Sequence, residues 1–361
     1  MERTRGAERA TATTLTVEGR TFLSFAGTGY LGLAHHPEVV EAAREALSTC
    51  GLSAGASRET SGSFVQHEQL EEALARFLGV EAALVTPSGW LANEALLASS
   101  PEPRLAFVDA DAHPSLTAAA GQGGAEVMTY DAADLAPVRQ RLSDVVGEAV
   151  ALCTDGLFPM AQRVADVPGL LELLPGDGLL VLDDSHGIGV LGEGGRGTAS
   201  QLGVTDARVA ITGSLAKALG AAGGLVAGSA ALVERVRAGG DSYAGTTPIP
   251  PAVAAGACAA LGVLEREPAR HGRLLENARR LGELGVRLGG PRHPLPIPVL
   301  AVPVPDEDRG RGLQDALGDA GLFVPWTRYG GGGGDLRIAV TSEHGAEEIE
   351  RLAVVLQEEL C

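Results

Sequence analysis

The chain has 361 residues, of which 45% are hydrophobic and 20% are charged, so it is long enough for a large buried core and two domains. A net charge of -18 at pH 7 argues against nucleic acid or an anionic membrane as a general partner, but leaves room for a small anionic ligand. The four cysteines lack metal-ligand spacing and no apolar run could span a membrane, which predicts a cytoplasmic protein with reduced thiols and no bound metal.

Short apolar runs alternate with amphipathic stretches through the middle of the chain. We expect helices at 67–78 and 91–99, and buried strands at 82–86, 105–109, 127–130, 150–154, 179–183, 209–212 and 225–228. This alternation predicts an α/β fold with a mainly parallel sheet, in which ligands bind beyond the carboxyl ends of the strands.

The pattern changes near Pro251. We expect helices at 252–265, 273–288 and 346–359, with proline-rich strand-like sequence before the last helix. Five consecutive glycines at 330–334 predict a flexible loop. The sequence therefore predicts an N-terminal segment (1–36), a large domain (37–250) and a smaller α+β C-terminal domain (251–361).

The pattern GxGxxG occurs twice, as GTGYLG at 27–32 and GIGVLG at 187–192. A dinucleotide-binding fold needs this motif between a strand and the first turn of a helix. Neither copy has that context, so we reject both as dinucleotide-binding motifs.

Lys217 is the only lysine in the chain, and it lies just beyond the expected strand at 209–212. Arginine can replace lysine on a solvated surface, but its guanidinium stays protonated and forms no Schiff base. Lys217 is therefore either a chance survivor on a helix face or an amine that the chemistry needs.

Two further groups stand at the ends of expected strands. Asp183 ends a buried strand, so its carboxylate needs a partner, although a solvated strand exit or a metal pair with His186 is also possible. Ser88 and Gly89 lie where a strand passes into a helix, and such a helix start can hold a phosphate.

His113 follows the end of another expected strand. A lysine, a buried carboxylate, an imidazole and a phosphate-binding helix start together describe a pyridoxal phosphate site.

In this context the chain resembles the α-oxoamine synthases, which are fold-type I pyridoxal phosphate enzymes. The resemblance runs from about residue 22 to residue 356. Its motifs are GYLGLAHHPEV, GASRETSG with HEQLEEALARF, SGWLAN, DAHPS, DGLFPM, LDDSHGIGVLGEGGRG, TGSLAKALG, TTPIPP and LRIAVTSEH. The resemblance implies a mainly parallel large domain, a smaller α+β domain and pyridoxal 5'-phosphate as cofactor.

The resemblance also implies the catalytic roles. Lys217 matches the Schiff-base lysine, which also acts as acid and base. Asp183 matches the partner of the pyridinium nitrogen, and His186 the donor to the phenolate oxygen of the ring. His113 matches the residue stacked on the ring.

Further matching residues are implied to bind cofactor or substrate. Those expected around the phosphate and the ring edge are Ser88, Gly89, Trp90 and Ser214, with Thr246 and Thr247 contributed by a second subunit. The active site would then be shared across a homodimer. Arg337 matches the arginine that grips the α-carboxylate of the substrate.

Three departures affect the substrate-facing parts of the motifs. Thr28 stands where the family usually has an asparagine near the substrate carboxylate, and Pro159 replaces a serine that contacts the cofactor. The glycines at 330–334 replace a proline-rich loop. We therefore expect a specialised member, in secondary metabolism, and not a housekeeping biotin enzyme.

The resemblance implies condensation of glycine, alanine or serine with an acyl thioester, from CoA or a carrier protein, with loss of carbon dioxide. An aldolase, decarboxylase, racemase or aminotransferase is the alternative that the three departures leave open. A non-catalytic partner subunit is the alternative from another class, and the retained Lys217 argues against it.

Overall fold

The computed structural model describes residues 6–99, 105–122, 124–144, 149–328 and 333–360. The chain forms two compact units. The larger unit comprises His36–Phe158 and Arg163–Arg266, and the smaller comprises Met1–His35, Pro159–Gln162 and Glu267–Cys361.

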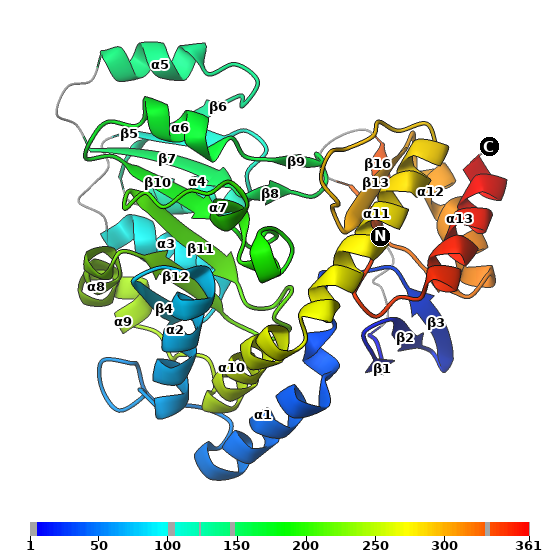
Figure 1. Cartoon of the computed structure of the whole chain (residues 1–361), viewed down its shortest axis with the longest axis horizontal. Coiled ribbons are helices and arrows are strands. Elements are labelled where there is room, and N and C mark those ends of the chain that lie inside the picture. Colours follow the sequence, from blue (N-terminus) through cyan, green and yellow to red (C-terminus); the bar gives the residue numbers. More distant parts are fainter. Residues whose placement is uncertain (1–5, 100–104, 123, 145–148, 329–332, 361) are drawn as a thin grey trace. The chain divides into compact units, whose positions relative to one another are not determined.

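A seven-stranded sheet forms the centre of the larger unit (Figure 1). In sheet order its strands are β4 (Ala82–Thr86), β12 (Gly224–Gly228), β11 (Val209–Ser214), β10 (Leu179–Asp183), β7 (Val150–Asp155), β5 (Leu105–Asp109) and β6 (Glu126–Tyr130). Strand β12 is antiparallel to both of its neighbours, and the other pairings in this sheet are parallel. The seven expected strands and the mainly parallel sheet are confirmed.

Along these strands, every second side chain points to the same face of the sheet and packs against helices. Val108, Val181 and Ala210 belong to one buried cluster with residues of α3 (Gly89–Ser99), α4 (Pro114–Gln122) and α8 (Ala230–Gly239). Near-continuous apolar strands of this kind are typical of a sheet covered on both faces. The other short elements of this unit are α5 (Ala136–Ser143), α6 (Val167–Leu173), α7 (Thr198–Gln201), α9 (Asp241–Ala244), β8 (Leu157–Phe158), β9 (Arg163–Val164) and η2 (Glu193–Gly195).

The observed units revise the domain boundary that we placed at residue 250. Helix α10 (Pro251–Arg266) belongs to the larger unit, where it packs against α1 (Pro37–Cys50) and α2 (Val65–Leu78). A Cβ added at Gly256 of α10 would lie 3.4 Å from the carbonyl oxygen of Val39 in α1, so the two helices approach closely. This contact depends on residues distant in sequence, which is why the local composition did not indicate it.

In its described residues, the smaller unit combines two small sheets with three α-helices. One sheet has the order β1 (Arg9–Ala10), β2 (Thr14–Val17), β3 (Arg20–Ser24) and β14 (Leu322–Phe323), and the other has β13 (Val299–Val304), β16 (Gly334–Ala339) and β15 (Trp326–Thr327). The helices are α11 (Pro268–Arg287), α12 (Glu307–Asp319) and α13 (Ala346–Leu360), and a short η1 (Leu33–His35) precedes α1. Their core includes Phe25, Leu281, Leu313, Ile338 and Leu352, and the α+β character is as expected.

Each helix in the described ranges is too short or too polar to span a lipid bilayer.

Candidate active site

The carboxyl ends of β4, β5, β7, β10 and β11 bring together polar groups from distant parts of the sequence. Lys217 acts electrostatically on His113, Asp155 and Asp184, and Asp183 acts on the same three groups. The lysine, the strand-end carboxylate and the imidazole that the sequence pointed to are therefore neighbours in the larger unit.

The two consecutive aspartates at the end of β10 have different partners. Asp183 Oδ2 accepts a hydrogen bond from Asn93 Nδ2 (2.7 Å), and its Oδ1 accepts one from the Ser185 N–H (3.1 Å). Asp184 accepts hydrogen bonds from the N–H and the Oγ1 of Thr198 (2.7 and 2.6 Å). Burial raises the pKa of Asp184 to about 6 despite these donors.

The glycines after β10 pack around Asp184. A Cβ added at Gly187 would lie 1.9 Å from Asp184 Oδ1, and one at Gly197 would lie 2.2 Å from Asp184 Oδ2. The GIGVLG sequence therefore forms a tight turn around a buried carboxylate, and it leads only into the three-residue 3-10 helix η2, not into an α-helix. This agrees with rejecting it as a dinucleotide motif.

The first turn of α3 lies against the ends of β11 and β12. Ser88 Oγ accepts a hydrogen bond from the Leu91 N–H (3.2 Å), so Ser88 caps the helix. A Cβ added at Gly89 would lie 3.1 Å from Ser214 Cβ, and one at Gly224 would lie 2.3 Å from the carbonyl carbon of Ser88. The structure thus brings Ser88, Gly89 and Ser214 together at a helix start whose N–H groups suit a phosphate.

Lys217 is half-buried in the turn that follows β11. Ser214 Oγ accepts a hydrogen bond from the Ala216 N–H (3.2 Å), and the Lys217 carbonyl oxygen accepts one from the Gly220 N–H (3.1 Å). Hydrogen bonds thus stabilise the turn before and after the lysine. A lysine amine beside buried carboxylates and a phosphate-binding helix start is a donor set that fits pyridoxal phosphate.

His113 lies directly before α4 and is exposed, with Trp90 as its aromatic neighbour. The two rings are edge to face, with centroids 5.8 Å apart and planes at 82°. Displacement of water from the imidazole lowers the pKa of His113, the charge of Asp183 opposes that shift, and Lys217 adds to it. His113 is therefore held toward its neutral form.

Asp155 is a site residue that the sequence analysis did not single out. It stands opposite Asp183 in the register of β7 and β10, and its Oδ1 accepts the His113 N–H (3.1 Å). Burial, reinforced by the charge of Asp183, raises the pKa of Asp155 well above its usual range. The only sequence signal was its place at the end of an apolar strand.

The remaining predicted residues of the larger unit lie in connecting segments. His186 is half-buried in the turn after β10. Thr246 is half-buried and Thr247 is exposed between α9 and α10. Roles for these three residues stay predictions.

The smaller unit holds the predicted carboxylate-binding residues. Arg337 is buried in β16, where its Nη1 donates to the Gly27 carbonyl oxygen (3.0 Å) and its guanidinium bonds the Tyr30 hydroxyl. Burial raises the pKa of Tyr30 to about 12. Thr28 is half-buried on the loop that Arg337 contacts.

The other two departures are also in the smaller unit. The Pro159 carbonyl oxygen accepts a hydrogen bond from Gln162 Nε2, which also donates to the Val299 carbonyl oxygen (2.6 Å). Of the glycine loop, residues 330–332 lie outside the described residues, and Gly334 begins β16.

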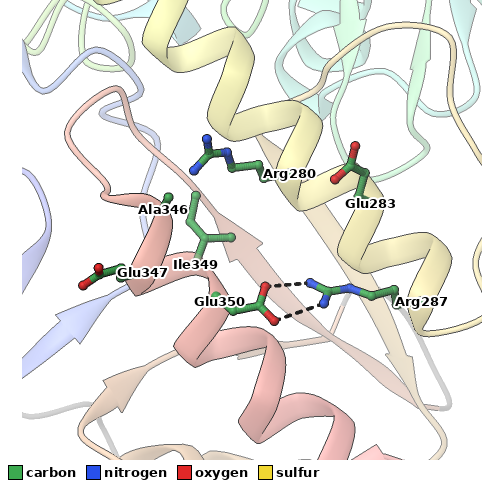
Figure 2. Close-up of a pocket in the computed structure, with 7 residues that line it drawn as sticks. All are labelled: Arg280, Glu283, Arg287, Ala346, Glu347, Ile349 and Glu350. Atoms are coloured by element: carbon green, nitrogen blue, oxygen red, sulfur yellow. Dashed lines mark hydrogen bonds and ion pairs between the residues drawn. The ribbon is translucent and has the colours of Figure 1, made fainter.

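A separate surface pocket lies between α11 and α13 (Figure 2). It is lined by Arg280, Glu283, Arg287, Ala346, Glu347, Ile349 and Glu350. Arg287 and Glu350 form an ion pair at 3.2 Å across it. None of the predicted site residues lines this pocket.

Among the described residues, no group of three or more histidine, cysteine or acidic side chains could hold a metal ion.

Comparisons with known proteins agree on one family. The model of aminotransferase class I and II matches residues 21–356. The 8-amino-7-oxononanoate synthase of Lysinibacillus sphaericus is 31% identical over 344 residues, which cover 92% of this chain and 87% of that one. The enzyme of the same name from Mycolicibacterium gilvum (strain PYR-GCK) is 37% identical over 267 residues, 73% of this chain and 70% of the other.

A solved structure of similar fold is a serine palmitoyltransferase variant from S. paucimobilis with bound PLP-myriocin aldimine. It has a TM-score of 0.91 and 25% sequence identity, and the match covers 97% of this chain and 90% of that chain.

Proposed function

Because the chain belongs to the α-oxoamine synthases within aminotransferase class I and II, we propose that it condenses a small amino acid with an acyl thioester. The enzyme is a pyridoxal phosphate-dependent acyltransferase, and glycine, alanine and serine are the candidate amino acids. The observation that carries the proposal is the position of Lys217, the only lysine, beside buried carboxylates and a phosphate-binding helix start.

The residues of the larger unit would hold the cofactor. The Lys217 amine would bond its aldehyde carbon, Asp183 would face its ring nitrogen and His186 its phenolate oxygen. The α3 start would receive the phosphate, through Ser88, Gly89, Trp90 and Ser214. When bound, the cofactor supplies an electron sink that stabilises negative charge on the amino acid Cα.

The protein then positions the substrate and moves protons. Arg337 holds the α-carboxylate, with Thr28 beside it, and Lys217 Nζ takes the proton from Cα. A carbon–carbon bond forms between Cα and the acyl carbonyl carbon as the carbon–sulfur bond breaks, and the thiol leaves. Loss of the carboxylate as carbon dioxide and return of a proton to Cα give the α-amino ketone. His113 would cover the ring face of the bound cofactor.

A homodimer with shared active sites is the second part of the proposal. Thr246 and Thr247 would reach the phosphate of the other subunit. Large apolar side chains that remain exposed in the single chain support such an interface, and within residues 40–90 they are Val40, Leu47, Leu52, Val65 and Trp90. The unpaired Cys50, Cys153 and Cys258 suit a cytoplasmic location, which we also propose.

The altered segments keep a second reaction class open. Thr28 and Pro159 replace polar groups that the family places near substrate and cofactor, and this favours a specialised member. If the acyl transfer is absent, a cofactor-dependent aldolase, decarboxylase, racemase or aminotransferase is the alternative.

The test is an absorption spectrum of the purified protein with pyridoxal phosphate, with Lys217→Ala and the charge-preserving Lys217→Arg alongside. We expect a Schiff-base band in wild type and in neither variant. One of glycine, alanine and serine should perturb that band, and an acyl-CoA should perturb it again. A band that responds to amino acids and ignores every thioester supports the alternative reaction class. Absence of the band in wild type contradicts the enzyme assignment.

A further inference from the structure

A continuous chain of hydrogen bonds joins Asp183 to His113 through two buried side chains that have no role in the reaction described above. Asn93 in α3 donates from Nδ2 to Asp183 Oδ2 (2.7 Å) and to Ser115 Oγ (2.9 Å). Ser115 Oγ in turn lies 2.7 Å from His113 Nδ1. Both Asn93 and Ser115 are almost completely buried.

The direction of each bond at Asn93 is fixed by its partners. A carboxylate oxygen only accepts, so the amide nitrogen must face Asp183. The amide oxygen then faces Thr212, whose Oγ1 donates to it at 2.5 Å. Both N–H groups and the oxygen of Asn93 are thereby used, and a flipped amide would place two acceptors 2.7 Å apart.

The direction at His113 follows from the helix that begins beside it. Pro114 is the first residue of α4, and the Ser115 N–H points at His113 Nδ1 (3.3 Å). His113 thus caps the helix with its ring nitrogen, which must accept. Ser115 Oγ accepts from Asn93, which leaves its O–H to donate to the same Nδ1.

We propose that Asn93 and Ser115 are positioning residues that couple the Asp183 carboxylate to His113 and hold the imidazole as the neutral Nε2–H tautomer. What this tautomer does for the reaction rests on the proposed function. An imidazole with a fixed plane and a fixed Nε2 proton would cover the cofactor ring, and its Nδ1 could not accept a further proton. None of the hydrogen bonds in the chain needs the cofactor, so the tautomer is set in the protein itself.

The charges around His113 are compatible with this assignment. Asp183 and Asp155 are the nearby acids, and Asp155 is engaged with the His113 backbone N–H. Lys217 is the nearby base and disfavours a second positive charge on the ring. Trp90 packs edge to face with the imidazole and brings no charge to it.

The test is the ¹⁵N NMR spectrum of protein labelled at histidine, recorded across a pH series with and without pyridoxal phosphate. His113→Gln identifies the His113 signals. We expect Nε2 to carry the proton in both forms of the wild type. In Ser115→Ala the proton affinity of His113 should rise about fivefold, which is the loss of about one neutral hydrogen bond. Ser342→Ala is the matched control, because Ser342 is equally buried and bonds the Leu31 carbonyl oxygen instead.

An Nδ1–H tautomer in wild type, or an unchanged proton affinity in Ser115→Ala, would overturn the proposal. If Ser115→Ala does not fold, the nearly isosteric Thr212→Val tests the far end of the chain, where a smaller rise is expected and no rise overturns it. The Schiff-base band is read from the same samples. A Schiff-base band together with an Nδ1–H tautomer would contradict this inference alone. An Nε2–H tautomer without a Schiff-base band would contradict the proposed function alone.

Discussion

At the scale of single residues, the end of β10 shows how neighbouring aspartates come to have separate roles. Consecutive side chains of a strand point to opposite faces, so Asp183 reaches Asn93 in α3 while Asp184 reaches Thr198. Asp183 thus keeps the place from which we propose it to face the cofactor, and Asp184 ties the residues after β10 to Thr198.

Asp184→Asn should lower the free energy of unfolding by about 1–3 kcal/mol, because Thr198 presents two donors and an asparagine offers them only one oxygen. Urea unfolding at neutral pH measures this. Asp206→Asn is the control, since Asp206 forms its ion pair with Arg208 at the surface, where a loss well below 1 kcal/mol is expected. Equal losses in the two variants would contradict the structural role of Asp184.

Asp155 gives a prediction about pH. Its pKa is raised in the folded protein, so the native state keeps a proton that the unfolded chain releases near the ordinary aspartate value. The contribution of Asp155 is therefore fully present at low pH and is lost as the pH rises through its folded pKa. Asp155→Asn cannot ionise, so the variant should not lose stability in this way. The free energy of unfolding of Asp155→Asn, relative to that of wild type, should therefore increase from pH 4 to pH 8. Urea unfolding of the cofactor-free proteins over that range checks it, and a constant difference would refute the burial argument.

The sequence pointed to Lys217, Asp183 and His113 together because each lies at or just beyond the end of an apolar strand. Asn93, Ser115 and Asp155 were missed because their importance depends on contacts between α3, α4 and β7. No local pattern distinguishes a buried polar residue with three partners from an ordinary helix residue.

At the scale of elements, the helix starts matter most for the site. Ser88 caps α3 and His113 caps α4, so two residues that we propose to face the cofactor also define where their helices begin. The strands were predictable since buried parallel strands read as continuous apolar runs. Helix α11 begins at Pro268, earlier than expected, because its first turn is polar and carries no apolar periodicity.

Gly224→Ala should weaken pyridoxal phosphate binding at least tenfold. The new Cβ would lie 2.3 Å from the Ser88 carbonyl carbon, so the start of α3 must move. Gly213→Ala is the control on the adjacent strand, where the nearest contact is the flexible end of Ile188 at 3.2 Å and we expect a change within about twofold. Titration of cofactor-free protein gives both affinities, and equal weakening would argue against a phosphate site at this helix start.

At the scale of the whole molecule, the residues that we propose for the cofactor all belong to the larger unit. Arg337 and Thr28, which we propose for the substrate carboxylate, belong to the smaller unit. The sequence indicated both sets but not the boundary at α10, which is fixed by packing against α1 and α2.

The shared site of the proposed homodimer can be tested by mixing inactive variants. Lys217→Ala and the double variant Thr246→Ala, Thr247→Ala should each be inactive alone. After mixing and subunit exchange, half of the dimers are hybrids with one intact site each, so about a quarter of wild-type activity should return. If each subunit uses its own threonines, no activity returns.

The central claim is acyl transfer onto an amino acid with loss of its carboxylate. The most direct measurement follows free thiol and carbon dioxide together, with ¹⁴C-carboxyl-labelled glycine, alanine or serine and a series of acyl-CoA thioesters. We expect one amino acid and one range of acyl chains to give the two products in equal amounts, and Lys217→Ala to give neither. Carbon dioxide without thiol, or thiol without any need for an amino acid, would contradict the assignment.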